Sequence, residues 1–214
     1  MLAPDTLVEG RPFTAPANTG QDAAVMTTML GRLRAMARGW LESAPTGVGF
    51  AVRRVDASGL RTWVRVPDRA ALLAAGNLTA IGFFGQARGE IDHRPIHELE
   101  AAIVATLEHV AGMLSYYDQE LPHGRYGNLI LCSDPEVAVR WRAHELHRRA
   151  VELAPRHYHS ARLHGGAVCS PLLGDADVTV LRTRYYDFDS HPPWLAVRGW
   201  HGGGVRTSYE SRRA

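Results

Sequence analysis

The sequence predicts an α+β fold in which an antiparallel sheet is backed by helices. From residue 78 onward, apolar patterns and chain breakers give the element order β-α-β-β-α-β, which is the ferredoxin-like unit. The chain has 214 residues and is 45% hydrophobic, so it can bury a core. A sheet of this kind leaves one face open, so pairing with a second copy as a homodimer fits this fold. We expect an extended N-terminal arm over 1–20, a single α+β domain over 21–200 with its ferredoxin-like core at 78–166, and a loose C-terminal tail over 201–214.

The first third of the chain is expected to form a long helix and a hairpin. Prolines and glycines recur through the first twenty residues, as in an arm without regular structure. Apolar residues at spacings of three and four predict an amphipathic helix over 22–43. The turn sequence Asp56-Ala57-Ser58-Gly59 separates two apolar stretches, which predicts a hairpin. Its strands are expected at 47–55 and 61–66, and a short helix at 68–75.

Local signals mark the elements of the core. The uncharged run Leu78–Gln86 is typical of a buried strand, and Pro95 suits the first turn of a helix. Ser133-Asp134-Pro135-Glu136 combines a capping side chain, a proline and an acid at the positive end of a helix dipole. This predicts a helix over 134–153. The remaining strands are predicted at 113–121, 126–132, 157–164 and 177–188.

Composition and motifs exclude several classes of function. A formal net charge of only +2 provides no electrostatic footprint for nucleic acid. All 24 basic residues are arginine, which removes mechanisms that need a lysine nucleophile. The two cysteines are far apart, no secretory signal is visible and no apolar run could span a bilayer, so we expect a cytoplasmic protein without a membrane partner. The motifs of serine hydrolases, zincins and dinucleotide-binding domains are missing from the sequence.

Histidines are concentrated in the second half of the core. Histidine ligates metals in its neutral form and transfers protons near neutral pH. The segment 126–166 carries five of the eleven histidines, namely His144, His147, His157, His159 and His164. His157 and His159 are two residues apart on a predicted strand, so both should point to one face, and Ala161 and Leu163 make that the inner face. Two histidines on the helix and two on the returning strand could therefore enclose one pocket.

The two helix histidines are alternatives for the inward position. His144 shares a helix face with Val137, Trp141 and Val151, so periodicity favours His144 as the inward residue. His147 lies about 60° away around the helix, on the flank of that apolar stripe.

Short motifs also connect this region with a known family. They are Gly82-Phe83-Phe84-Gly85, Tyr126-Gly127-Asn128-Leu129, Asp134-Pro135, Arg140-Trp141, His147-Arg148-Arg149-Ala150-Val151 and Tyr158-His159-Ser160. On these residues the chain resembles the haem-dependent aldoxime dehydratases, within the dimeric α+β barrel group, over roughly residues 78–190.

The resemblance implies a lyase that binds haem b and acts on a small nitrogen-containing substrate. By resemblance, His147 is the iron ligand and His159 is the distal acid and base for N–O cleavage, which releases water and leaves a nitrile. Tyr158 and Arg162 are expected to assist His159. Trp141, Arg88 and His157 are expected to bind the cofactor, and His144 is the alternative metal ligand. The guanidinium groups of Arg88 and Arg162 suit haem propionates or an acidic substrate.

Two further functions remain open. The same fold without haem could bind a hydrophobic small molecule, with His159 and Tyr158 or Tyr117 in acid–base roles, as in cofactor-free monooxygenases or cyclases of the barrel group. Alternatively, the protein binds a small ligand without catalysis and its histidines are structural. The two Tyr-Tyr-Asp segments, which end in Asp118 and Asp187, are interpreted as strand ends at the surface.

Overall fold

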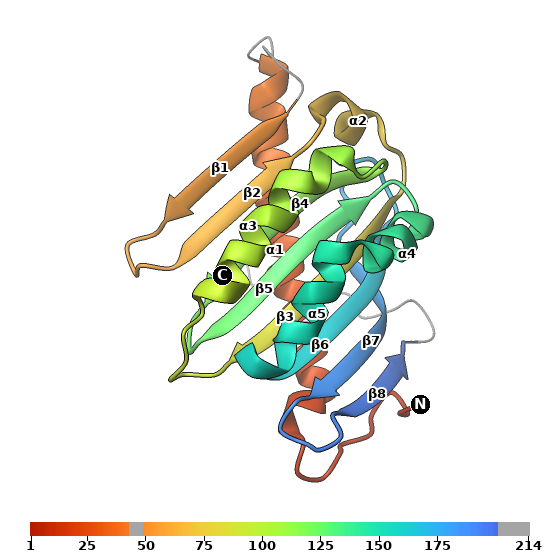
Figure 1. Ribbon diagram of the computed structural model, residues 1–214. Coiled ribbons are helices and arrows are strands. Elements are labelled where there is room, and N and C mark those ends of the chain that lie inside the picture. The colour runs from red at the N-terminus through yellow and green to blue at the C-terminus, as the bar shows by residue number, and fades with distance from the viewer. Residues whose placement is uncertain (43–48, 201–214) are drawn as a thin grey trace.

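The computed structural model describes residues 1–42 and 49–200, and its strands form a single antiparallel sheet (Figure 1). The order of the strands across this sheet is β1-β2-β4-β5-β3-β6-β7-β8. Their bounds are β1 Phe50–Val55, β2 Arg61–Val66, β3 Leu78–Ala87, β4 Met113–Leu121, β5 Arg125–Cys132, β6 Tyr158–Val168, β7 Thr179–Asp187 and β8 Trp194–Gly199. The predicted tail over 201–214 and the first residues of the strand predicted at 47–55 lie outside the described residues.

The centre of the sheet has the predicted ferredoxin-like topology. Strand β3 leads through α3 (Arg94–Thr106) to the hairpin β4–β5, and β5 leads through α4 (Pro135–Ala143) and α5 (Glu145–His157) to β6. These four strands are adjacent in the order β4-β5-β3-β6, which is the order of that unit. The α+β class and the helix-backed antiparallel sheet predicted from the sequence are therefore confirmed.

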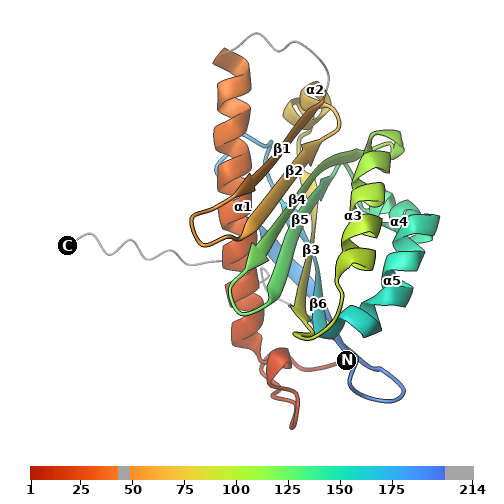
Figure 2. The same cartoon turned by 60° about the vertical axis from the view of Figure 1, so that its left-hand side comes forward.

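One face of the sheet is covered by α1 (Pro16–Glu42), which crosses behind the strands in Figure 1 and lies on the side opposite α3, α4 and α5 in Figure 2. The side chains of Met26, Met29, Leu30 and Leu33 are fully buried against the sheet residues of this face. Gly82 on β3 makes the close approach possible, because a Cβ atom there would lie 2.6 Å from the sulfur of Met26. The face that the sequence analysis expected to be open is thus closed by a helix of the same chain.

The opposite face is covered by α3, α4 and α5 (Figure 2). A second apolar cluster joins these helices to the sheet, with Leu99, Ile103 and Trp141 on the helices and Tyr116 and Ile130 on the strands. The two clusters use alternate residues of the same strands, as the two-residue period of a strand requires. The sheet is therefore covered on both faces by helices of one chain.

The predicted helix over 134–153 is two helices in the structure. Asp134 caps α4 as expected, accepting hydrogen bonds from the amides of Glu136 and Val137 at 2.9 and 3.2 Å. His144 has extended backbone angles (φ −66°, ψ 136°), which end α4 and start α5. The second helix continues through Pro155 to His157, because a proline in the last turn removes only one hydrogen bond. His157 therefore ends a helix and does not begin β6.

The N-terminal segment is more ordered than the predicted arm over 1–20. The helix α1 begins at Pro16 and is preceded by a short 3-10 helix, η1 (Pro12–Thr14). Arg198 on β8 is fully buried and donates hydrogen bonds to the carbonyls of Ala3 and Thr14 at 3.0 and 2.7 Å. Its guanidinium satisfies carbonyl groups of a segment that has few regular backbone hydrogen bonds. Two short helices, α2 (Arg69–Ala74) and η2 (Leu107–His109), complete the described elements.

Candidate functional site

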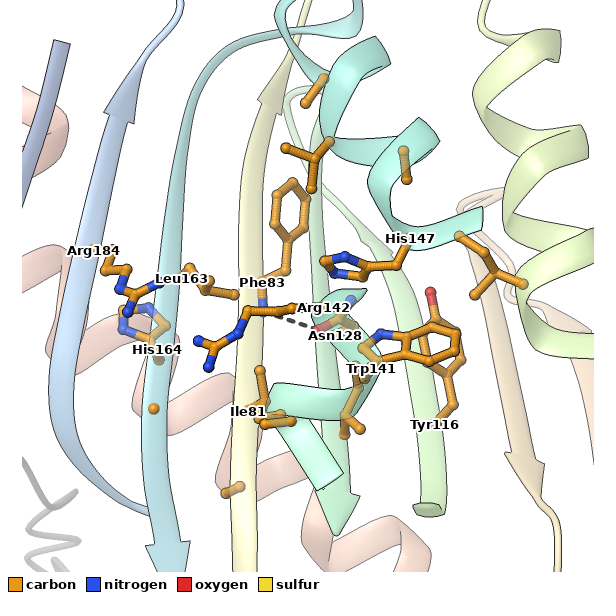
Figure 3. A pocket seen from close by; sticks show the side chains of 18 of the residues that line it. Ile81, Phe83, Tyr116, Asn128, Trp141, Arg142, His147, Leu163, His164 and Arg184 are labelled. Atoms are coloured by element: carbon orange, nitrogen blue, oxygen red, sulfur yellow. Dashed lines mark hydrogen bonds between the residues drawn. The ribbon is translucent and has the colours of Figure 1, made fainter. Parts of the chain in front are cut away.

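A cleft of about 1150 Å³ lies between the sheet and the helices α3, α4 and α5. Ile81 and Phe83 from β3 and Leu163 from β6 form part of its floor (Figure 3). Ile130 from β5 also lines it. These residues occupy the strand positions that alternate with those facing α1. Large apolar clefts with a few polar groups are the usual form of small-molecule sites.

A glycine on β6 leaves part of the cleft floor without a side chain. Gly165 lies two residues after Leu163 and lines the cleft, and a Cβ atom built on it would meet no atom within 4 Å. Gly82, on the opposite face of the neighbouring strand, is in close contact with Met26. The α1 face is therefore filled, whereas the face toward α3–α5 retains space.

Two carboxyl groups lie together in the part of the cleft near α3. Glu100 on α3 accepts a hydrogen bond of 2.9 Å from the phenol of Tyr116 on β4. Asp118 is on the same strand, two residues after Tyr116. Burial, together with the charges of Glu100 and Glu120 and a hydrogen bond to Glu100, raises the pKa of Asp118 well above its ordinary value. The Asp118 carboxyl therefore takes up a proton more readily than an ordinary aspartate does, and it can share that proton with Glu100 through the hydrogen bond between them. Such perturbed groups in a cleft mark candidate catalytic sites.

Phenol groups surround this acidic pair. The rings of Tyr126 and Tyr158 meet edge to face with centroids 6.3 Å apart, and Tyr158 meets Phe83 in the same way at 5.2 Å. Burial raises the pKa of Tyr116, Tyr126 and Tyr158, and nearby carboxylates add to the effect. These phenols therefore stay protonated near neutral pH and can donate hydrogen bonds. Tyr158 lines the cleft, as expected for a predicted catalytic residue.

Asn128 on β5 presents an amide to the cleft in a fixed orientation. Its Oδ1 accepts a hydrogen bond of 2.9 Å from the backbone amide of Phe83, which is drawn as a dashed line in Figure 3. Because the oxygen is engaged, the amide hydrogens on Nδ2 remain for a ligand.

His147 is the predicted iron ligand that reaches the cleft. Its ring meets the edge of Trp141 with centroids 5.6 Å apart, and its Nδ1 is buried without a hydrogen-bond partner among the described residues. Burial, and then the charges of Arg142 and His144, lower the pKa of His147, so the ring is neutral near pH 7. His144 stacks on the ring of Trp141, with centroids 5.2 Å apart, and does not line the cleft. The structure thus places His147 and Trp141 at the cleft, and His144 against Trp141 but outside the cleft lining.

The strand histidines do not converge with His147. A β-bulge in the β3–β6 pairing sets Ala87 opposite Tyr158 and Gln86 opposite Ser160, which leaves His159 as the extra residue. His159 is half exposed, and its Nδ1 lies 2.9 Å from Asp189 and 3.2 Å from Arg88. His157 is buried beside His93, with 3.4 Å between their Nδ1 atoms. The expectation that His157 and His159 share an inward face was therefore wrong, because the alternation of the strand is interrupted there.

The two arginines predicted to serve the cofactor or substrate are engaged elsewhere. Arg88 pairs with Asp189 at 2.6 Å, outside the cleft. Arg162 lies on the α1 face, where its guanidinium donates hydrogen bonds of 2.5 and 3.0 Å to the carboxylate of Asp22. His164 also binds Asp22, at 2.9 Å, and its other ring nitrogen lies 3.0 Å from the hydroxyl of Thr183. Arg162 therefore stabilises the packing of α1 on β6.

Sequence reasoning missed the acidic pair and the arginines at the mouth of the cleft. Asp118 was expected at the surface, but it lies within β4, two residues after the buried Tyr116. The alternation of this strand was the signal that could have placed it inside. Four arginines line the cleft, namely Arg142, Arg148, Arg182 and Arg184. Nothing in the sequence distinguishes them from the other arginines of the chain.

Comparisons with known proteins add little to this geometry. No protein-family model matches the sequence, and no curated protein matches it. A crystal structure from Fusobacterium nucleatum subsp. nucleatum, named "putative monooxygenase", is similar with a TM-score of 0.37 and 11% sequence identity. The similarity covers 57% of this chain and 52% of that one, so this chain spans about half of its length. Among the described residues, no helix is both apolar enough and long enough to cross a bilayer, and no cluster of three metal-binding side chains occurs.

Proposed function

We propose that the protein is an enzyme that binds an apolar small molecule in the cleft and removes a proton from it, with Asp118 and Glu100 as the acid–base pair. The observation that supports this most directly is the carboxyl pair itself, which lies in a cleft whose floor and walls are mainly apolar. A carboxyl group with a raised pKa is a stronger base when ionised than an ordinary aspartate, and general bases work best when their pKa is near the working pH.

The residues around the pair suit the formation of an anion on the ligand. When Asp118 takes a proton, Glu100 can share it while Tyr116 holds Glu100 in place. The phenols of Tyr126 and Tyr158 can donate hydrogen bonds to oxygen atoms that gain negative charge. The reaction class is therefore deprotonation of a phenol or of a carbon beside a carbonyl, with the proton passing to Asp118.

Hydrogen exchange at an acidic carbon would test this proposal without knowledge of the natural substrate. 2-Tetralone in deuterated water exchanges its α hydrogens when a base removes them, and proton NMR follows the loss of signal. We expect the wild-type protein to accelerate exchange and Asp118→Asn or Glu100→Gln to reduce the acceleration about 10²- to 10⁴-fold. Asp189→Asn, an exposed carboxylate outside the cleft, is the matched control and should keep the wild-type rate. Exchange that is equally fast in all four proteins would contradict the proposal.

Haem binding is the second candidate, and His147 is the observation that favours it. The ring is neutral and lines a cleft of about 1150 Å³, and its buried Nδ1 has no hydrogen-bond partner among the described residues, so His147 would be the residue to hold the haem iron. Haem would supply an iron that binds the nitrogen of an aldoxime. The distal residue of the resemblance does not fit, because His159 is outside the cleft and bonded to Asp189.

A visible absorption spectrum separates the two candidates. Haemin added to the wild-type protein should give a sharp Soret band if His147 binds iron, and His147→Ala should remove the band while His144→Ala retains it. Conversion of an aldoxime to its nitrile by the loaded protein would then support the lyase reaction. A spectrum equal to that of free haemin would exclude this candidate and leave the acid–base proposal intact.

A further inference from the structure

Two of the arginines that line the cleft, Arg142 from a helix and Arg184 from the sheet, have no acidic partner among the described residues. Arg142 extends from α4 across the strands, and Arg184 rises from β7, with both guanidinium groups on the same side of the cleft (Figure 3). Neither forms an ion pair or a side-chain hydrogen bond within residues 1–42 and 49–200. Glu152 on α5 also lines the cleft, but it pairs with neither of them.

The guanidinium groups of Arg142 and Arg184 line one cleft and have no carboxylate partner in the part of the chain that the structure describes, which favours the binding of an anion. Arginine binds carboxylates through two parallel hydrogen bonds. Some arginines of the chain have acidic partners, as Arg61 has Glu120, Arg65 has Glu108 and Arg88 has Asp189. Arg142 and Arg184 have none among the described residues and also line the cleft, so a ligand there can supply the counter-charge.

The surroundings of these arginines are apolar, which defines the rest of the ligand. Val139 on α4, Val151 on α5 and Leu181 on β7 line the cleft and are 47%, 58% and 49% exposed. Leu181 reaches the cleft because a bulge in the β6–β7 pairing leaves it without a partner, between Val180 and Arg182. Exposed apolar side chains gathered at a cleft indicate the entry of an apolar body.

The two ends of the cleft have opposite charge, which fixes the direction of the ligand. Asp118 and Glu100 would repel an anionic group near α3, and the arginines would attract it near β7. We propose that the ligand is an amphipathic anion whose carboxylate binds Arg142 and Arg184 while its apolar body presents the reacting group to Asp118. This inference deepens the proposed function and rests on it. The carboxylate could belong to a small apolar acid or be a propionate of a porphyrin.

A matched pair of fluorescent probes tests the inference. 1-Pyrenebutyrate and neutral 1-pyrenebutanol share one apolar body and differ in the charged group. We expect the wild-type protein to bind the carboxylate at least about tenfold more tightly than the alcohol, because a charge-assisted hydrogen bond is stronger than a neutral one. Arg142→Gln and Arg184→Gln should each remove most of this preference without changing the affinity for the alcohol. Arg149→Gln, an exposed arginine on α5 that does not line the cleft, should change neither.

The outcomes distinguish the inference from the function on which it rests. Equal affinity for both probes in the wild-type protein, or a preference that survives in both cleft variants, would overturn the anion site and leave the apolar cleft supported. Binding of neither probe would contradict the proposed function and the inference together. A haemin Soret band that requires Arg142 and Arg184, as well as His147, would assign the carboxylate to a porphyrin. Displacement of pyrenebutyrate by apolar acids, without a Soret band, would assign it to a small acid.

Discussion

Two carboxyl groups on opposite faces of one sheet have opposite electrostatic environments. Asp22 on α1 is fully buried, and although burial alone would raise its pKa, hydrogen bonds from His164 and Arg162 and their charges hold the pKa below its usual value. Asp118 lies under α3, where burial and the neighbouring carboxylates Glu100 and Glu120 raise its pKa. Cationic side chains of the same chain therefore stabilise the negative charge of Asp22, whereas neighbouring carboxylates destabilise the negative charge of Asp118.

The same contrast extends to packing and to the remaining polar groups. On the α1 face, the side chain of Met26 fills the space beside Gly82, and Arg162 is paired with Asp22. On the face covered by α3, α4 and α5, the space beside Gly165 is unfilled, and the Nδ1 atom of His147 has no hydrogen-bond partner among the described residues. Unmatched charge and unfilled space cost stability, so their concentration on one face indicates the site of function.

The largest effect is expected at Asp22. Asp22→Ala leaves Arg162, Arg125 and His164 without their shared counter-charge, and breaking a buried ion pair in this way costs about 3–5 kcal/mol. Urea unfolding followed by circular dichroism measures the change. Asp189→Ala, which removes an exposed carboxylate paired with Arg88 and His159, should cost no more than about 1 kcal/mol and is the control. Equal losses in the two variants would remove the distinction between the faces.

Asp118→Asn should have the opposite sign. Asparagine keeps the shape of the side chain but removes the unfavourable ionisation, so the variant should be more stable than the wild type by about 1–3 kcal/mol at pH 8. The raised pKa means that the wild type has its full stability below the ordinary aspartate range and loses it as the pH rises through the folded-state value. Thermal unfolding at several pH values should show a difference that grows with pH. A less stable variant at pH 8 would show that Asp118 is paired as Asp22 is.

The two glycines provide a matched test of filled and open space. Gly165→Leu should abolish binding of 1-pyrenebutanol, because the side chain enters the cleft, with a stability change within about 0.5 kcal/mol. Gly82→Ala should destabilise the protein by about 1–3 kcal/mol, because the new Cβ overlaps Met26, and should leave probe binding unchanged. Fluorescence titration and urea unfolding of both variants measure the two properties. The reverse pattern would show that the cleft is not the ligand site.

Acid should affect activity before it affects the fold. Exchange of 2-tetralone requires ionised Asp118, so the rate should fall as the pH drops through the raised pKa of this residue. The pKa of Asp22 is lowered, so its stabilisation is present above the ordinary aspartate value and is lost only as the pH falls through the lower folded-state value. Initial rates and circular dichroism, recorded on the same samples, should therefore show two separate transitions. A single common transition would indicate that the loss of activity is unfolding.

The smallest effect is expected at His147 in the absence of haem. His147→Gln should change the free energy of unfolding by less than about 0.5 kcal/mol, because the ring nitrogen Nδ1 makes no hydrogen bond that the variant would lose. Urea unfolding measures it, beside Trp141→Ala, which empties part of the helix cluster and should cost about 3–5 kcal/mol. A large loss in His147→Gln would show that this histidine is structural.

Local signals in the sequence predicted more of the fold than of the candidate site. Prolines, the Asp134 cap and the apolar runs specify where elements start and end, and these specify the ferredoxin-like order. Tyr158, Trp141 and His147 line the cleft, and His147 is the residue that the resemblance, against the periodicity, named as the iron ligand. His159 and Arg162 do not line it, because a bulge turns the first outward and the second occupies a strand position on the α1 face, where it binds Asp22, a residue distant in sequence. Pairings over such separations, and single-residue bulges, leave no periodic trace in a sequence.

The position of α1 also has a thermodynamic consequence. The helix is joined to the sheet that it covers, so burial of Met26, Leu30 and Leu33 is an intramolecular event. The free energy gained on that face is therefore the same in a dilute and in a concentrated solution, in contrast to a sheet whose second layer is supplied by another molecule.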